Sequence, residues 1–266
     1  MSREETTKGD GSVTTTKAES VLWVELCNPG RLNALTWRMY DQLEMLPAYL
    51  ATQEDIRAVV FRGEGGTAFA AGTDINQFGG FHTGEQGVAY EHRVGAVFEA
   101  LSTITVPTIA LVEGPAVGAG LAVVACCDIV LATPESVFGA PIARTLGNCL
   151  PAPVIARLQS RLGVNRTMTM LLTATTLSAR DAQAAGFVHQ VLPRVDIEEE
   201  LRKMLKRITT SAPLTLASIK EISRRLERAT PTAESDDLLQ LCYGSADFQE
   251  GVRAFLEHRH PVWKGQ

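Results

Sequence analysis

Cysteine is scarce in this sequence, and its five residues form no metal-binding or disulfide pattern. Their number is odd, no C-x-x-C pair occurs, and no histidine lies at zinc-site spacing. These absences exclude a disulfide framework and a structural zinc site, and we expect no metal and no separate cofactor. A reducing cytoplasm fits best. The cysteines are Cys27, Cys126, Cys127, Cys149 and Cys242.

The sequence also lacks an excess of positive charge and lacks long hydrophobic runs. It has 25 Lys and Arg residues against 30 Asp and Glu, a net charge of -5, and no basic stripe. This balance excludes the electrostatic footprint of a nucleic-acid-binding protein. The longest apolar run lies around residues 121–125, far short of the about 18 residues that a membrane span needs. The polar residues 1–10 do not resemble a secretory signal.

Apolar strands alternate with helical segments over the first 150 residues. With 45% hydrophobic residues, the chain can build a sizeable core. Continuous apolar runs bounded by turn signals predict strands buried on both faces of a parallel sheet. The first dozen residues read as a frayed leader or a polar first strand. We expect strands at residues 21–26, 58–61, 108–112 and 128–132, and helices at residues 36–52, 88–101 and 120–126.

The last third of the sequence is predominantly helical in pattern. Its only expected interruption is a short strand-like stretch at residues 188–191. We therefore divide the chain into an α/β core domain of residues 1–200, which holds the ligand site, and a C-terminal helical region of residues 201–266. Helices are expected at residues 154–162, 166–172, 179–185, 197–209, 214–227 and 238–243.

Two glycine-containing turns, residues 69–74 and 113–121, each follow an apolar strand. Small residues in such a turn let backbone N–H groups approach a ligand, and a turn that opens a helix directs its free N–H groups at an anion. Either turn alone is more often ordinary turn chemistry. Together they are able to form an oxyanion hole, whereas neither G-x-G-x-x-G nor G-x-x-x-x-G-K-[ST] occurs to support nucleotide binding.

The two turns belong to a series of motifs that runs from about residue 20 to the end of the chain. The motifs are Gly30-Arg31-Leu32-Asn33-Ala34-Leu35, Ala68-Phe69-Ala70-Ala71-Gly72-Thr73-Asp74-Ile75, Gly118-Ala119-Gly120, Cys127-Asp128-Ile129, Phe138-Gly139-Ala140-Pro141, Ser211-Ala212-Pro213-Leu214, Lys220-Glu221, and residues 247–257 and 261–265. Their order resembles the crotonase (enoyl-CoA hydratase/isomerase) superfamily.

This resemblance implies a fold, a ligand and an assembly. The implied fold is α/β, a crotonase-like spiral of ββα repeats with a C-terminal helical trimerisation layer, and the implied assembly is a homotrimer or a dimer of trimers. The implied ligand is an acyl-CoA thioester, with coenzyme A as part of the substrate. Its carbonyl would accept hydrogen bonds from the backbone N–H groups of Thr73 and Ala119, which stabilise a developing enolate or oxyanion.

Further positions are implied to bind coenzyme A. Trp263 and Lys264 would reach the nucleotide held by a neighbouring subunit. Asn76 stands where the family often has a lysine, so one phosphate-facing charge is missing. The implied coenzyme A residues are Arg31, Leu32, Ala71, Asp74, Ile75, Asn76, Trp263 and Lys264.

The sequence departs from the family at the two glutamates of the hydratases. Their positions correspond here to Ala122 and to Ile142, or to Ala143 if one residue is inserted. None of these side chains can transfer a proton, and general acid–base catalysis needs an ionisable group within hydrogen-bond reach. Standard hydration by the glutamate pair is therefore not expected.

Several nearby side chains are candidates to replace the glutamates. Arg144 is suited to bind a substrate carboxylate, or else forms a surface or interchain salt bridge. Asn148 and Cys149 lie in the same polar loop, and Cys149 is either a reactive thiol or a small buried residue. His82 or Glu91 is able to supply proton transfer, but the stretch with Glu85, Glu91 and His92 also reads as the solvated face of a helix.

The leading hypothesis is a lyase or isomerase of fatty acid metabolism that polarises an acyl-CoA thioester and acts through an enolate-like species. Isomerisation, hydration by a non-standard acid–base group, decarboxylation or other C–C cleavage, and thioester hydrolysis all remain open. The alternative is a non-catalytic acyl-CoA-binding or assembly protein. A polar loop directed into the pocket favours the enzyme, and an entirely apolar pocket favours the binder.

Overall fold

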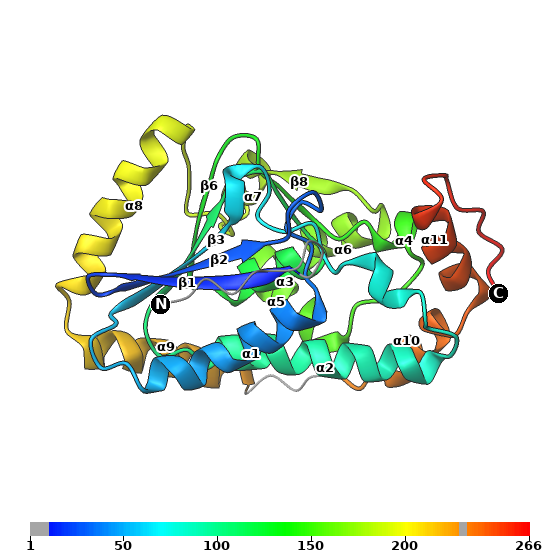
Figure 1. Cartoon of the computed structure of the whole chain (residues 1–266), viewed down its shortest axis with the longest axis horizontal. Helices are drawn as coiled ribbons and strands as arrows, with labels where there is room; N and C mark the ends of the chain where they lie inside the picture. The colour runs from blue at the N-terminus through cyan, green and yellow to red at the C-terminus, as the bar shows by residue number, and fades with distance from the viewer. Residues whose placement is uncertain (1–10, 229–232) are drawn as a thin grey trace.

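The computed structural model describes residues 11–228 and 233–266. Its centre is a six-stranded sheet, whose place in the molecule Figure 1 shows. The first two strands are antiparallel, and all other neighbours in this sheet are parallel. The expected buried strands are therefore confirmed. Part of the predicted leader, residues 1–10, lies outside the described residues. In order across the sheet, the strands are β1 (Ser12–Ala18), β2 (Val21–Cys27), β3 (Ala58–Gly63), β4 (Thr108–Val112), β6 (Ile129–Ala132) and β9 (Gln190–Val191).

A second, three-stranded sheet lies beside the first. Its strands are β5 (Pro115–Val117), β7 (Val137–Gly139) and β8 (Thr176–Ser178). β7 pairs in parallel with β5 and antiparallel with β8. Each strand has three residues, too few to show an alternating or continuous apolar pattern. Together with the C-terminal helices, the two sheets form an α/β architecture, as the motif resemblance implied.

The helices agree with the expected ones in order and type, but some boundaries differ and two helices were not expected. α2 begins at Gly84 instead of residue 88, because Thr83 caps it and forms a reciprocal capping box with Gln86. α4 and α11 were not among the expected helices, and α8 begins at Arg194 instead of residue 197. The helices are α1 (Trp37–Ala51), α2 (Gly84–Ser102), α3 (Ala119–Cys126), α4 (Ile142–Thr145), α5 (Ala152–Leu162), α6 (Val164–Leu172), α7 (Ala179–Ala184), α8 (Arg194–Thr209), α9 (Pro213–Arg228), α10 (Asp236–Tyr243) and α11 (Ala246–Leu256), with short 3-10 turns η1 (Glu64–Gly66) and η2 (Ile75–Phe78).

Alternate residues of the large sheet pack on opposite faces. Val60 of β3 belongs to a cluster with Ile197 and Leu201 of α8, whereas Val59 belongs to the main core with residues of α1, α2 and α3. Figure 1 shows α8 on one side of the sheet and α1 and α2 along the other. The strands are thus buried on both faces, as their continuous apolar sequences predict. The division of the chain near residue 200 stays a prediction.

Two glycines of α2 let α10 pack directly against its backbone. A Cβ atom on Gly87 would lie 2.1 Å from Cβ of Tyr243, and one on Gly84 would lie 2.2 Å from the backbone oxygen of Gln240. A larger residue at either position would push the two helices apart. This close approach buries Tyr243 completely, against the helix that carries Glu91.

The surface bears on the predicted assembly and on the predicted lack of nucleic-acid binding. α9 contributes no buried residue and exposes large apolar side chains. These side chains are Leu214, Ile219, Ile222 and Leu226. An exposed apolar face of this kind fits a contact face of an oligomer, and the trimer stays a prediction.

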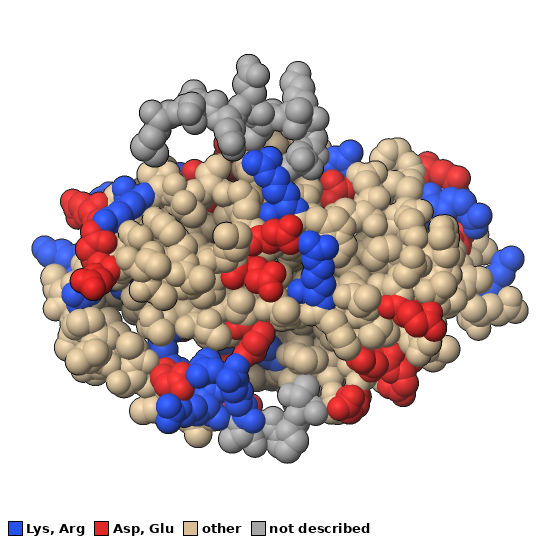
Figure 2. All heavy atoms as spheres, turned by 60° about the horizontal axis from the view of Figure 1, so that its bottom comes forward, with Lys and Arg blue, Asp and Glu red and all other residues tan. Residues whose placement is uncertain are grey.

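On the face that Figure 2 shows, acidic and basic side chains are interspersed and form no continuous basic stripe. Among the described helices, none is both long and apolar enough to cross a membrane.

Candidate active site

The two predicted glycine turns meet in space. A Cβ atom on Gly118 would lie 3.4 Å from Cα of Gly72, and one on Gly72 would lie 4.0 Å from the backbone nitrogen of Ala119. Gly118 caps α3 with φ 56° and ψ -120°, a backbone conformation that side chains of L-residues disfavour. The glycines therefore allow the contact that brings the amides of Thr73 and Ala119 to neighbouring positions.

Neither of these two amides donates a backbone hydrogen bond to another described residue. Thr73 pairs with Leu35 in a short parallel bridge, in which the nitrogen of Leu35 donates to the oxygen of Gly72 at 2.7 Å and the nitrogen of Asp74 donates to the oxygen of Leu35 at 2.8 Å. In such a bridge, the N–H of Thr73 itself points away from its partner. Ala119 is the first residue of α3, where the helix offers no acceptor. Both donors are thus available to a ligand.

A cavity of about 450 Å³ lies in front of the two turns. Its size is typical of a small-molecule site. Ala122 and Ile142, where the motif resemblance implies the family's two glutamates, are part of its wall. Its other walls come from α2, from the loop around α4 and from the mouth at residues 30–32. Polar or ionisable lining residues include Thr73, Tyr90, Glu91, Thr145 and Asn148.

The side chain of Thr73 is fixed by two buried tyrosines. Its hydroxyl oxygen lies 2.6 Å from the hydroxyl of Tyr40 and 2.6 Å from that of Tyr90. Burial raises the pKa of both phenols above the ordinary value, so both stay neutral and able to donate. This triad fixes the turn that carries the Thr73 amide.

Glu91 is a buried carboxyl group in the wall of the cavity, as is Asp74 at its mouth. Glu91 is 6% exposed, and its Oε1 accepts a hydrogen bond from the hydroxyl of Tyr243. Burial raises the pKa of Glu91 to about 8, although the hydrogen bond from Tyr243 acts in the opposite direction. The solvated-face interpretation is therefore wrong for Glu91. It is right for its neighbour His92, which is exposed and lies 2.9 Å from Asp236.

Asn148 links the polar loop to this pair. Its Nδ2 donates to the hydroxyl of Tyr243 at 2.9 Å, whereas its buried Oδ1 has no hydrogen-bond partner among the described residues. A buried amide oxygen without a partner is costly, so a ligand or water that donates to it would be bound there. Tyr40 and Tyr243 were not identified as site residues from the sequence, because each is distant in the chain from the residues it contacts.

The other candidates lie outside the cavity wall. Arg144 and His82 are exposed, and neither lines the cavity. Cys149 is half-buried, and burial raises the pKa of its thiol to about 11, opposite to the shift that would activate a nucleophile. Within the described ranges, no group of three or more His, Cys, Asp or Glu residues is placed to hold a metal ion.

Residues implied to bind coenzyme A form one side of the cavity mouth. The guanidinium of Arg31 lies 3.2 Å from the carboxylate of Asp74, and that carboxylate accepts a hydrogen bond from the backbone nitrogen of Asn76 at 3.1 Å. Asn76 itself is exposed and does not line the cavity. The lining members of the implied set are Arg31, Leu32, Ala71, Asp74 and Ile75.

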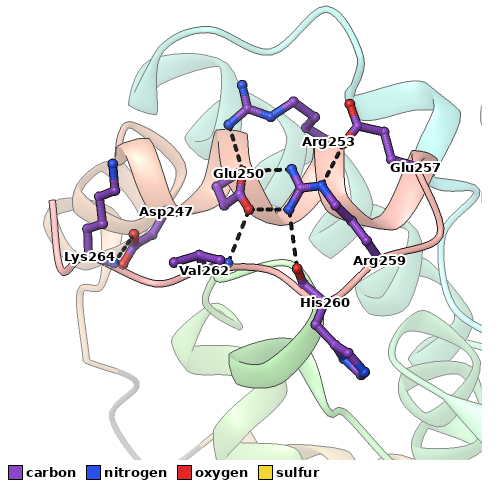
Figure 3. Close-up of polar contacts among 8 residues, drawn as sticks. All are labelled: Asp247, Glu250, Arg253, Glu257, Arg259, His260, Val262 and Lys264. Atoms are coloured by element: carbon purple, nitrogen blue, oxygen red, sulfur yellow. Dashed lines mark hydrogen bonds and ion pairs between the residues drawn. The ribbon is translucent and has the colours of Figure 1, made fainter.

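The C-terminal segment lies on α11 of its own chain (Figure 3). The carboxylate of Asp247 accepts hydrogen bonds from the backbone nitrogen of Lys264 at 2.7 Å and from that of Gly265 at 2.8 Å. Glu250, beside Arg253 and Arg259, accepts from the backbone nitrogen of Val262 at 3.1 Å, and these partners lower the pKa of Glu250 well below its usual value.

Trp263 packs next to Gly147, where a Cβ atom would be 3.2 Å from the indole ring. Neither Trp263 nor Lys264 lines the cavity of its own chain. This leaves contact with a neighbouring subunit's nucleotide as a prediction.

Comparisons with known proteins agree with the fold. The family model "Enoyl-CoA hydratase/isomerase" matches residues 16–266. A "Probable enoyl-CoA hydratase, mitochondrial" of Dictyostelium discoideum is 31% identical over 253 residues, which cover 94% of this chain and 90% of that protein. A "Probable enoyl-CoA hydratase echA6" of Mycobacterium tuberculosis is 31% identical, with coverage of 94% and 98%.

Solved structures give the same result. A methylmalonyl-CoA decarboxylase complexed with 2S-carboxypropyl-CoA superposes with a TM-score of 0.86 at 27% identity, covering 100% of each chain. An enoyl-CoA hydratase/carnitine racemase from Magnetospirillum magneticum gives a TM-score of 0.78 at 29% identity, covering 96% of each chain. The matched family model, the similar sequences and the shared fold together place this protein in the enoyl-CoA hydratase/isomerase (crotonase) superfamily.

Proposed function

We propose that this protein isomerises an enoyl-CoA thioester, using the amides of Thr73 and Ala119 to bind the carbonyl oxygen and the carboxyl group of Glu91 to move a proton. The observation that carries the proposal is the placement of Glu91. It is buried in the wall of the cavity that Thr73 and Ala119 also line, and Ala122, where the motif resemblance implies the family's glutamate, lines the same cavity.

The two amides supply the electrostatic part of the reaction. When a proton leaves the carbon next to the thioester, negative charge moves onto the carbonyl oxygen. Preorganised N–H groups stabilise that oxygen more strongly in the enolate than in the neutral thioester, which lowers the barrier. The short bridge to Leu35 and the first turn of α3 fix these donors before the substrate binds.

A single carboxylate is sufficient for moving a double bond. Ionised Glu91 takes a proton from the α carbon of a β,γ-enoyl thioester, and the electron pair spreads over the carbon chain and the thioester oxygen as a dienolate. The same carboxyl group then returns the proton to the γ carbon, which gives the α,β-enoyl product and restores the carboxylate. Tyr243 and Asn148 hold the carboxyl group in position.

A second candidate reaction is decarboxylation of a malonyl-type thioester. It is favoured by the similarity to the methylmalonyl-CoA decarboxylase structures, among them a complex with 2-nitronate-propionyl-CoA. Loss of carbon dioxide gives the same type of thioester enolate without a base, because the departing carboxylate leaves its electron pair behind. An oxyanion hole and an apolar cavity would suffice for this step.

The polar lining favours an enzyme over a passive acyl-CoA binder, since Glu91, Thr145 and Asn148 line the cavity.

We further propose that the active assembly is a homotrimer or a dimer of trimers, supported by the exposed apolar side chains of α9. Some relatives are named as mitochondrial proteins, and the cytoplasmic location stays a prediction.

The test is a substrate panel followed by mass spectrometry and by absorbance of the conjugated enoyl thioester. We expect wild-type protein to convert a β,γ-enoyl-CoA, and Glu91→Gln to lose at least about a hundredfold in rate. Methylmalonyl-CoA turnover that survives Glu91→Gln would instead support decarboxylation. Binding of thioesters without any turnover would contradict both reactions and leave the acyl-CoA binder.

A further inference from the structure

Three hydroxyl groups form a cluster beside the turn that carries the Thr73 amide. The hydroxyl oxygen of Thr73 lies 2.6 Å from that of Tyr40 and 2.6 Å from that of Tyr90, and the three side chains form no other hydrogen bond with the described residues. Thr73 is half-buried and Tyr90 is buried, and both line the cavity of about 450 Å³. Tyr40 is 0% exposed and does not line it. The proposed reaction uses the amide of Thr73 but none of its side-chain atoms.

The cluster has one more hydroxyl proton than its internal hydrogen bonds can use. Each hydroxyl carries one proton, so three protons serve the two hydrogen bonds. A buried donor without an acceptor is costly, and Thr73 is the sole partner of Tyr40 among the residues that the structure describes, so Tyr40 donates to Thr73. The remaining proton therefore belongs to Thr73 or to Tyr90. Because both line the cavity, the cluster offers an O–H donor to a ligand there.

The acidity of the three groups assigns this proton to Thr73. A phenol is a stronger acid than an aliphatic alcohol and therefore the better donor, and the oxygen of Thr73 has two lone pairs to accept from both phenols. Burial raises the pKa of Tyr40 and of Tyr90, so both phenols keep their protons. The two hydrogen bonds that Thr73 accepts polarise its own O–H group, which becomes a stronger donor.

Aromatic packing fixes the two phenols before a ligand binds. The ring of Tyr90 makes edge contacts with Trp37 and Phe78, at centroid distances of 5.6 Å and 5.0 Å. Trp37 also contacts the ring of Tyr40 at 5.9 Å. Tyr40 belongs to α1 and Tyr90 to α2, so two helices hold the hydroxyl of Thr73. A donor that is fixed in advance stabilises developing charge without reorganisation.

We propose that the side-chain hydroxyl of Thr73 is a third hydrogen-bond donor to the thioester oxygen, beside the amides of Thr73 and Ala119, and that Tyr40 and Tyr90 are the positioning residues that hold and polarise it. Only Cα and Cβ separate the amide nitrogen of a threonine from its hydroxyl oxygen, so one acceptor atom can lie within reach of both. This inference rests on the proposed function, since it requires the thioester to lie at these amides. It applies equally to isomerisation and to decarboxylation, because both pass through an enolate.

Infrared spectra of bound butyryl-CoA, isotope-labelled at the carbonyl carbon, test this contact without turnover. A hydrogen bond to a carbonyl oxygen lowers the stretching frequency of the C=O bond. Thr73→Val removes the hydroxyl and keeps the amide, so we expect a higher frequency for the bound thioester than in the wild type. Thr73→Ser keeps a hydroxyl and should restore the lower frequency. Equal frequencies in the wild type and in folded Thr73→Val would overturn the inference and leave the proposed function intact.

Rates measure what the hydroxyl contributes to the reaction. With a β,γ-enoyl-CoA, we expect kcat of Thr73→Val to fall about tenfold to a hundredfold and KM to change less than about threefold, because the charge on the oxygen develops in the transition state. Thr73→Ser should stay within about threefold of the wild type in kcat. Equal losses in both variants would mean that Thr73 acts through packing, against the inference. No turnover of any thioester by the wild type would instead contradict the proposed function, and the infrared comparison would then decide the inference alone.

Tyr40→Phe tests the polarising role from a position that a ligand in the cavity does not contact. Because Tyr40 reaches the thioester only through Thr73, we expect a smaller rise in the carbonyl frequency and a loss in kcat of about threefold to tenfold. Tyr49→Phe is the matched control, since Tyr49 lies on the same helix, is exposed and does not line the cavity. An unchanged frequency in folded Tyr40→Phe would show that Tyr40 is not a positioning residue.

A double variant keeps the test decisive if Thr73→Val fails to fold, as judged by circular dichroism. Thr73→Val leaves the buried hydroxyl of Tyr40 without its acceptor, whereas replacing both partners by apolar groups costs much less stability. Tyr40→Phe combined with Thr73→Val should therefore fold. It should show the raised carbonyl frequency and the loss in kcat expected of Thr73→Val, and wild-type values of both would overturn the inference.

Discussion

The two parts of the candidate site are constructed differently. The oxyanion part consists of backbone amides in two glycine turns that are held by neighbouring strands and by the start of α3. The proton-transfer part consists of side chains brought together from α2, α10 and the loop after α4. The first is encoded locally and is shared in motif with the family, whereas the second depends on contacts between distant segments. Charge stabilisation and proton transfer should therefore respond to different substitutions.

The largest effect should come from Gly118→Val, which acts on the backbone part. Gly118 has a φ of 56°, where a β-branched residue is strained, and its relaxation would move the Ala119 amide. Loss of one oxyanion donor costs about a hundredfold to a thousandfold in rate. We expect that decrease in kcat/KM for every thioester reaction of the protein.

Gly80→Val is the matched control for this substitution, because Gly80 is exposed and nothing lies within 4 Å of its Cβ position. Its kcat/KM should stay close to that of the wild type. Activity that survives in Gly118→Val, with circular dichroism showing a native fold, would mean that the amide of Ala119 does not bind the thioester.

A smaller effect should follow from Tyr243→Phe, which acts on the side-chain part. As a base, Glu91 must be ionised, so the isomerisation rate should rise with pH through its pKa of about 8. The hydroxyl of Tyr243 lowers that pKa, and its removal should move the rising limb to higher pH. A hydrogen bond to a charged group is worth about 1.5–3 kcal/mol, so we expect a loss of at least about tenfold at pH 7.

The pH–rate profile separates this role from simple packing. A structural defect would lower the rate equally at all pH values, whereas loss of the hydrogen bond should be partly compensated at high pH. Asn148→Ala should move the profile in the same direction but by less, because Asn148 reaches Glu91 only through Tyr243. A profile without a pH-dependent limb near 8 would exclude Glu91 as the base.

The contrast also explains how far the sequence could predict the molecule. Strands β2, β3, β4 and β6 were predictable, because strands buried on both faces have continuous apolar sequences. The glycine turns were also predictable from local sequence, because glycine after an apolar strand marks a turn. β5, β7 and β8 have three residues each and owe their pairing to the tertiary fold.

The burial of Glu91 could not be predicted from its own helix. It is followed by exposed His92 and lies on a segment that is polar in pattern. What buries it is α10, about 150 residues later, which approaches closely because Gly84 and Gly87 of α2 have no side chains. The pair of glycines three residues apart was the available signal, but it names no partner helix.

The smallest effect should come from Arg31→Ala, at the mouth between the two parts. The ion pair with Asp74 is half exposed at the arginine, and exposed ion pairs contribute about 0–1 kcal/mol. We expect the free energy of unfolding to change by less than about 1 kcal/mol, and KM for an acyl-CoA to rise about threefold with kcat unchanged. Arg202→Ala is the control. It removes a more exposed ion pair with Glu199, which does not line the cavity, and it should leave KM unchanged. If the mouth only binds the coenzyme A part of the ligand, as we propose, kcat should stay unchanged. A fall in kcat for Arg31→Ala would show that Arg31 also positions Thr73 through Asp74, which would tie the mouth to the backbone part of the site.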